Sequence, residues 1–315
     1  MLLFSSSAHS REAKIAVLAL QLFILATAAA AAPVALPGCP ETCGNITVPY
    51  PFGTRPGCFC EGFNLTCDET PGRRPKLLVG DGVEVVGISL PEGTVRVHTK
   101  MLGVWPSTYA TPLQFNGSWS VGLVATGRLA VSTSHNRFVA MGCNLLASLG
   151  VHEAVIDPGS YVSVCAALCA DNDVSKVSDT SCSGVGCCQT PIARGLPSYG
   201  VQLSDLAAPS SGGWPGRALF IADQEWFSRM GPLLLTDFFG AEQRIIHKTV
   251  IPSVLEWSLD ASRDQDLLFW GSDDSGRCIS LNSVFDGVRC NCSKGFDGNP
   301  YIANGCQGTA IRHAY

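Results

Sequence analysis

The sequence predicts a mostly β, disulfide-rich protein made of small β-sandwich-like modules. Three observations predict this fold class. All 15 cysteines follow an apolar N-terminal segment, the first of them being Cys39. Short apolar runs recur between Gly, Pro, Ser and Asn, a pattern typical of strands separated by turns. Side chains alternate between apolar and polar along residues 83–97, which predicts a β-hairpin.

Residues 1–32 are predicted to be a secretory signal peptide. Arg11 and Lys14 precede an apolar run that starts at Ile15 and continues in small residues to Ala32. A basic start, an apolar centre and a small-residue exit are the parts of such a signal. A signal anchor that stays in the membrane is the alternative, which the short, Ala-rich run disfavours.

Cysteine density and glycosylation sequons both indicate an extracellular, oxidising environment, because disulfides persist there. Four Asn-x-Ser/Thr sequons follow the leader, and we expect glycans at them. They are Asn45, Asn64, Asn116 and Asn291.

The charge and hydropathy of the chain argue against nucleic-acid binding and against a membrane span. The net charge is −5, and no Lys/Arg stripe with interleaved aromatic residues occurs, which argues against nucleic acid. No apolar run of about 20 residues follows the leader, so we expect no membrane span in the mature chain.

Three regions are predicted along the mature chain. Residues 39–106 form a cysteine-rich domain that ends in the hairpin, with its turn at Pro91–Gly93. Residues 107–260 form a second β-rich, cysteine-containing domain, in which 223–229 is a short helix with Asp223 as its N-cap. Its predicted strands are 121–125, 129–131, 138–141, 161–164 and 218–221.

Residues 261–307 are predicted to form a degenerate EGF-like module. Cys290 and Cys292 stand two apart, a Gly295-Phe296 turn follows, and Cys306 is the last cysteine. A module this small has little apolar core and depends on disulfides for stability.

Several motifs in this order are similar to one known family. They are Cys43-Gly44, Pro49-Tyr50-Pro51-Phe52-Gly53, Cys58, Phe63–Cys67, Asn136–Cys143, Ser183–Gln189 and Gly295–Tyr301. On these residues the chain resembles the galacturonan-binding ectodomain of plant wall-associated kinases. The resemblance implies a secreted, cell-wall protein whose ligand is pectin or oligogalacturonide.

The chain departs from that family in two respects. It contains no kinase motif, so the resemblance carries over no kinase activity. Two cysteines of the EGF-like part are missing, near 260–264 and at Trp270. In the family's pairing Cys292 keeps Cys306, while Cys278 and Cys290 are orphaned and could pair with each other. No calcium site is expected in this module.

An odd number of cysteines leaves at least one thiol without an intrachain partner. Cys60 is our candidate, because the family's galacturonan-binding motifs do not require a cysteine beside Cys58. The alternative is a member of a central cluster, which consists of Cys165, Cys169, Cys182, Cys187 and Cys188. A zinc site in that cluster is disfavoured, since exported thiols oxidise. The expected disulfide cysteines are Cys39, Cys43, Cys58, Cys67, Cys143, Cys165, Cys169, Cys182, Cys187, Cys188, Cys292 and Cys306.

Nothing in the sequence indicates catalysis, a metal or a cofactor. Asp171-Asn172-Asp173 fits a solvated loop better than a calcium site, and His152-Glu153 fits a surface pair. We therefore expect a binding protein and no enzyme.

An anionic polysaccharide should be contacted by basic side chains, arginine above all. The tight basic group is Arg73, Arg74 and Lys76, for which a solvated loop is the structural alternative. Arg55 and either Arg96 or Lys100 could extend this group. Tyr50 and Phe52 could stack on sugar rings, although packing under the turn is favoured for at least one of them.

Three functions remain open from the sequence. The chain is a soluble pectin binder, a protein–protein module that assembles with receptor ectodomains, or a truncated product without a separate role. We favour the first of these.

Overall fold

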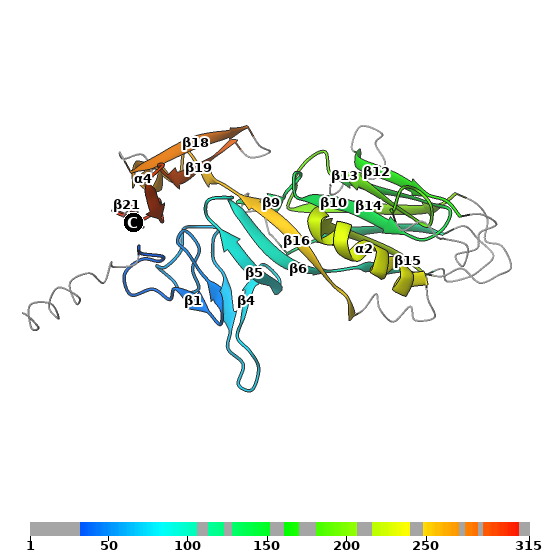
Figure 1. The fold of residues 1–315 in the computed structure, drawn as a ribbon, viewed down its shortest axis with the longest axis horizontal. Helices are drawn as coiled ribbons and strands as arrows, with labels where there is room; N and C mark the ends of the chain where they lie inside the picture. The colour runs from blue at the N-terminus through cyan, green and yellow to red at the C-terminus, as the bar shows by residue number, and fades with distance from the viewer. Residues whose placement is uncertain are drawn as a thin grey trace, which may run out of the picture.

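The computed structural model contains several small antiparallel sheets and one long helix among the residues that it describes (Figure 1). This confirms the predicted fold class. The described residues are 32–105, 113–122, 128–151, 161–169, 181–206, 216–239, 248–270, 275–282 and 286–308.

A six-stranded sheet forms the centre of the molecule, in the order β3-β4-β5-β6-β16-β9. The predicted hairpin is confirmed as β5 and β6, with a turn in which Gly93 has φ 64°. β9 and β16, from the predicted second region, complete the sheet of the first, so the predicted boundary near residue 106 cuts across one sheet. The strands are Thr66–Asp68 (β3), Lys76–Val79 (β4), Val83–Ser89 (β5), Thr94–Lys100 (β6), Leu129–Val131 (β9) and Val250–Trp257 (β16).

Two four-stranded sheets, β13-β10-β15-β7 and β12-β11-β14-β8, lie on the side of the central sheet away from β1 and β18 (Figure 1). The predicted strands near 138, 161 and 218 are confirmed within β10, β12 and β15. The bounds are Leu102–Val104 (β7), Gln114–Ser120 (β8), Asn136–Met141 (β10), Leu145–Val151 (β11), Tyr161–Ala167 (β12), Cys187–Pro191 (β13), Ser198–Asp205 (β14) and Arg217–Asp223 (β15).

The strand predicted at 121–125 does not begin there. β8 ends at Ser120, and Gly122 follows with φ 67°, a left-handed conformation that ends the extended run. Val121 is nevertheless fully buried, as its apolar side chain suggests. Residues 123–127 lie outside the described part, as do 152–153 and 171–173.

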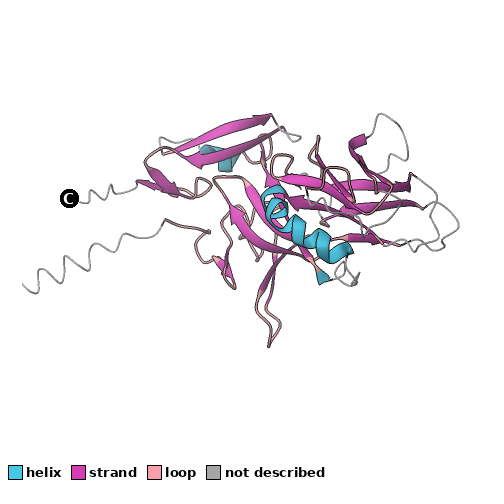
Figure 2. Cartoon of the chain, turned by 45° about the vertical axis from the view of Figure 1, so that its right-hand side comes forward, coloured by secondary structure: helices cyan, strands magenta, loops and turns pink. Residues whose placement is uncertain are grey.

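The helix predicted at 223–229 is longer than expected and spans Gln224–Phe239 as α2 (Figure 2). Asp223 is its N-cap, because its Oδ1 accepts the N–H groups of Glu225 at 2.8 Å and Trp226 at 3.0 Å. The apolar face continues beyond residue 229 at helical spacing, with Phe227, Leu234 and Phe238 buried. That burial extends the helix past Pro232.

The C-terminal part contains a three-stranded sheet, β17-β19-β18, and a final two-stranded ribbon. β17 begins two residues before the predicted boundary at 260/261. The bounds are Leu259–Asp260 (β17), Gln265–Trp270 (α4), Gly276–Asn282 (β18), Asp286–Cys292 (β19), Phe296–Gly298 (β20) and Cys306–Gly308 (β21); near the other end of the chain Thr42–Cys43 (β1) pairs with Ile46–Thr47 (β2).

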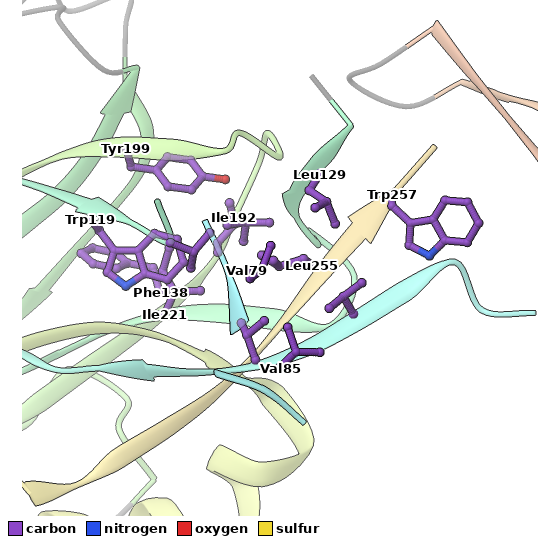
Figure 3. Packing of buried hydrophobic residues seen from close by; sticks show 14 of the residues in the cluster. Val79, Val85, Trp119, Leu129, Phe138, Ile192, Tyr199, Ile221, Leu255 and Trp257 are labelled. Carbon is purple, nitrogen blue, oxygen red and sulfur yellow. The ribbon is translucent and has the colours of Figure 1, made fainter. Parts of the chain in front are cut away.

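A hydrophobic core runs through the central sheet and its neighbours, and a second cluster packs α2 against β10 and β15. Figure 3 shows Val79 and Val85 of the central sheet near Leu255, with Phe138, Ile221 and Trp119 of the four-stranded sheets packed beyond them. All of these side chains are buried. The core therefore joins regions that the sequence treats as separate.

An aromatic cluster joins the beginning of the described chain to its end. Phe52 packs edge-on against Phe63 at 5.0 Å and Trp257 at 5.4 Å between ring centroids, and Tyr301 lies 5.5 Å from Trp257. Asn299 donates from Nδ2 to the carbonyl of Tyr50 at 2.7 Å. Phe52 is fully buried, so it packs under the turn, as the sequence favours.

Seven disulfides are present among the described residues, and Cys60 is a free thiol. Cys292 pairs with Cys306, and Cys278 pairs with Cys290. The cysteines of the central cluster are all paired in disulfides, so none of them is a thiolate that could bind zinc. The other pairs are Cys39–Cys58, Cys43–Cys67, Cys143–Cys169, Cys165–Cys188 and Cys182–Cys187.

Candidate functional site

An open cleft of about 750 Å³ lies between the central sheet and the end of β8. Strands β3 to β6, with the turn between β4 and β5, form one wall, and β7, β8 and the start of β16 form the rest. We call it the β4–β8 cleft. Its lining residues are Asp68, Lys76, Leu78, Asp81, Gly82, Val83, Glu84, His98, Thr99, Lys100, Met101, Leu102, Ser118, Trp119, Ser120, Gly122 and Val250.

The charged side chains of this cleft share the outward face of the central sheet. Strand alternation places Val97 in the core and His98 and Lys100 outside. Across the strands, Asp68 pairs with Lys76 and Glu84 pairs with His98. The pleat therefore gathers groups from four strands onto one surface.

A β-bulge sets the pairing of Glu84 with His98. Val85 pairs with Val97, but the next pair along the strands is Gly87 with Arg96, so Val86 is an extra residue on β5. If Val86 paired in an unbroken hairpin register instead of bulging, Glu84 would lie opposite Thr99, which faces the core. The bulge thus brings the carboxylate and the imidazole to the same face.

Glu84 is the electrostatic centre of the cleft. Its Oε2 lies 3.0 Å from Lys76 Nζ and 3.6 Å from His98 Nδ1. Burial raises the pKa of Glu84, but the hydrogen bond and charge of Lys76 outweigh it, so the pKa lies below its ordinary value. Glu84 is therefore an ionised carboxylate at neutral pH.

The opposite wall supplies hydroxyl groups over a buried aromatic ring. Ser118 and Ser120 are exposed, while Trp119 is buried and packs 6.3 Å from Tyr199 between ring centroids. Hydroxyls and charges of both signs suit a polar ligand such as a sugar acid. Among the described residues, no group of three or more His, Cys, Asp or Glu side chains could hold a metal ion.

Two of the basic residues singled out from the sequence line the cleft. Lys76 is one, and Lys100 is the other; Lys100 is exposed and forms no ion pair with the described residues. Arg96 lies on the same face of β6, but its Nη1 binds Asp223 Oδ2 at 2.5 Å, at the N-terminus of α2.

The remaining predicted binding residues are solvated and do not line the cleft. Arg73 and Arg74 are exposed in the loop between β3 and β4, and Arg55 is exposed after the turn at Gly53. Tyr50 is half-buried, and burial, helped by the charges of Cys60 and Asp264, raises its pKa to about 12. Arg55, Arg73 and Arg74 therefore stay predicted binding residues that the cleft does not include.

Sequence reasoning missed Glu84, His98 and the β8 wall. Glu84 and His98 lie on the predicted hairpin, and their outward positions were readable from the alternation. Their mutual pairing was not, because it depends on the bulge. Ser118 and Trp119 are far away in the sequence, and no local signal connects them to β4 or β6.

Three of the four sequon asparagines are exposed. Asn45 and Asn64 lie in the first region, and Asn116 lies on β8, two residues before the cleft residue Ser118. Asn291 is half-buried on β19. A glycan at Asn116 would extend from the strand that forms the cleft wall.

Comparison with known proteins defines the class of the domain that forms one wall of the cleft. A family model described as wall-associated receptor kinase galacturonan-binding matches residues 39–99. This segment contains Asp68, Lys76, Glu84 and His98. No solved structure matches the chain.

Over about 85% of its length the chain resembles wall-associated receptor kinases, which confirms the resemblance that the motifs indicated. Wall-associated receptor kinase 2 of Arabidopsis thaliana is 31% identical over 284 residues, covering 85% of this chain and 34% of that protein. Wall-associated receptor kinase 4 of the same plant is 30% identical over 283 residues, covering 86% and 34%.

The chain spans about a third of the length of these relatives. Among the described residues, every helix is too short or too polar to cross a membrane.

Proposed function

We propose that the chain is an extracellular, non-catalytic binding protein for de-esterified galacturonan, and that the β4–β8 cleft is its binding site. The observation that carries this proposal is the overlap of the galacturonan-binding match, residues 39–99, with four charged residues of the cleft. The exposed sequon residues and the disulfides support secretion into the cell wall, with glycans at Asn45, Asn64 and Asn116.

Lys100 and Lys76 are the proposed contacts for uronate carboxylates. Lys100 has no competing partner among the described residues, whereas Lys76 is shared with Glu84. Ser118 and Ser120, both exposed on β8, can bond sugar hydroxyls. Charge-assisted hydrogen bonds to carboxylates are the strongest contacts that such a cleft can make.

The test is calorimetric titration of an oligogalacturonide into wild-type protein and two double variants. Lys76→Ala/Lys100→Ala should weaken binding about tenfold or more, because it removes both cations of the cleft. Arg73→Ala/Arg74→Ala is the matched control, with two exposed cations removed from the nearby loop. Greater loss in the arginine variant would move the site to the loop. Absence of binding by the wild-type protein would reject the function.

A second proposal is association with receptor ectodomains. It is supported by exposed apolar side chains on β11 and β12, at Leu146 and Val164, on the sheet that holds β8. Leu146→Asp/Val164→Asp should abolish co-purification with the ectodomain of a wall-associated receptor kinase and leave oligogalacturonide binding unchanged. Unchanged co-purification would reject this surface.

A further inference from the structure

A lysine and a histidine of the cleft converge on a single carboxylate oxygen. Lys76 on β4 and His98 on β6 both point to Oε2 of Glu84 on β5, at 3.0 and 3.6 Å. A neutral imidazole leaves Lys76 as the charged partner of Glu84. A protonated imidazole gives Glu84 a second cation, and Lys76 is then less firmly held.

The charge of the cleft depends on that imidazole. Five other charged residues line the cleft, two of them lysines and three of them carboxylates, so their sum is −1. Protonation of His98 brings the sum to zero. Arg96, on the same face of β6, is matched by Asp223 and changes neither sum. The five residues are Asp68, Lys76, Asp81, Glu84 and Lys100.

We propose that Glu84 determines the charge of the ligand that the cleft accepts, and that protonation of His98 switches the cleft toward anionic sugars. With His98 neutral, Glu84 repels a uronate carboxylate and occupies Lys76. With His98 protonated, Glu84 is matched by the imidazolium, and Lys76 becomes available to the ligand. This inference rests on the proposed function, since it concerns the same cleft.

The other groups facing His98 keep their charge over the relevant pH range. The pKa of Asp68 is lowered by hydrogen bonds from Thr70, and that of Glu84 is lowered by Lys76 against the raising effect of burial. Lysines stay protonated, and ordinary carboxylic acids, the uronate included, stay ionised above about pH 5. Histidine is the side chain whose charge ordinarily changes between about pH 5 and 8.

The test is the affinity of a de-esterified oligogalacturonide at about pH 5.5 and about pH 7.5, at fixed ionic strength. We expect wild-type protein to bind about three- to fivefold more tightly at the lower pH, the size expected of a partly exposed charge pair. His98→Gln should bind weakly at both pH values. Glu84→Gln should bind more tightly than wild-type protein at about pH 7.5, because Lys76 is then released without protonation of His98.

Two controls separate this switch from general effects of pH. His135 lies 3.9 Å from Glu256 in a similar half-exposed pair outside the cleft, so His135→Gln should keep the wild-type response. A methyl-esterified oligomer lacks the carboxylates, and its binding should not respond to pH.

Each result has a distinct consequence. Absence of binding by the wild-type protein at both pH values rejects the proposed function itself. Binding that is equal at both pH values leaves that function standing and overturns the switch. A pH response that survives in His98→Gln also overturns it, as does Glu84→Gln binding no more tightly than wild-type protein at about pH 7.5. Because the two variants have opposite expected effects, misfolding of one still leaves the other as a test.

Discussion

The two ends of the central sheet differ in kind, although the same strands form both. β6 and β16 pair along their length, from Lys100 opposite Val250 to Thr94 opposite Glu256. At the first end they border the open, charged β4–β8 cleft. At the other end β16 finishes in Trp257, inside a closed aromatic cluster with Phe52 and Tyr301. We call the buried end around Trp257 the dry end, because its aromatic rings exclude solvent and join distant parts of the chain. We call the end that borders the β4–β8 cleft the wet end, because its charged side chains are accessible to solvent.

This difference indicates that the turn from Pro49 to Gly53, one of the motifs shared with the family, stabilises the fold. Phe52 belongs to the Pro-Tyr-Pro-Phe-Gly turn, yet it is fully buried against β16. The groups available to a ligand come from the strands that follow it. Stability and binding should therefore respond to substitutions at opposite ends of the sheet.

The largest effect on stability is expected at the dry end. Trp257→Ala removes a ring that contacts Phe52, Phe63 and Tyr301, so the free energy of unfolding should fall by about 3–5 kcal/mol. Urea denaturation measures it. Val250→Ala, at the other end of β16 and 49% exposed, is the control. Similar losses for both variants would erase the distinction between the ends.

A smaller effect is expected from the hydroxyl of Tyr301. It accepts the N–H of Cys290 at 2.8 Å and donates to the Cys290 carbonyl at 3.0 Å. Tyr301→Phe leaves both backbone groups buried without this partner, so the unfolding free energy should fall by about 1–2 kcal/mol. An unchanged denaturation midpoint would show that the stability of the C-terminal part does not depend on this contact.

The thiol of Cys60, also near the dry end, should react slowly with alkylating reagents. Burial, with the charge and hydrogen bond of Asp264, raises its pKa to about 11, against a usual thiol value of about 8.5. Because the raised pKa favours the neutral thiol, alkylation by iodoacetamide should be slow at neutral pH and accelerate only as the pH approaches about 11. Rapid alkylation of the folded protein at neutral pH would contradict this assignment.

The smallest effect on stability is expected at the wet end. Lys76 pairs with Glu84 in a partly exposed bridge, with 52% of the lysine side chain accessible. Lys76→Ala and Lys100→Ala should each change the unfolding free energy by less than about 0.5 kcal/mol. Lys294→Ala, an exposed lysine of the C-terminal part, is the control. A large destabilisation would make the cleft lysines structural rather than ligand-binding.

The sequence could predict individual strands and helices more readily than the long-range pairing and packing between them. Alternation and a Gly-containing turn predict β5 and β6, and Asp223 predicts the start of α2. The end of α2 was missed because burial of Phe238 and its neighbours extends the helix past Pro232. The entry of β9 and β16 into the central sheet is a long-range pairing that local patterns do not encode.

The candidate site shows the same limit. Lys76 and Lys100 were identified by their charge, which is a local property. Their separation from Arg73 and Arg74 was not, because it depends on which residues enter a strand and which remain in a loop. Glu84 joins the site only through the bulge at Val86, and Ser118 only through the packing of β8 beside the central sheet.

Hydrogen–deuterium exchange with and without a de-esterified oligogalacturonide tests the location of the site most directly. We predict protection of the turn at Asp81-Gly82 and of the segment from Ser118 to Gly122, on the two walls of the cleft. The loop at Arg73-Arg74 should exchange at the same rate with and without the ligand. Protection of that loop, with both cleft segments unchanged, would contradict the account.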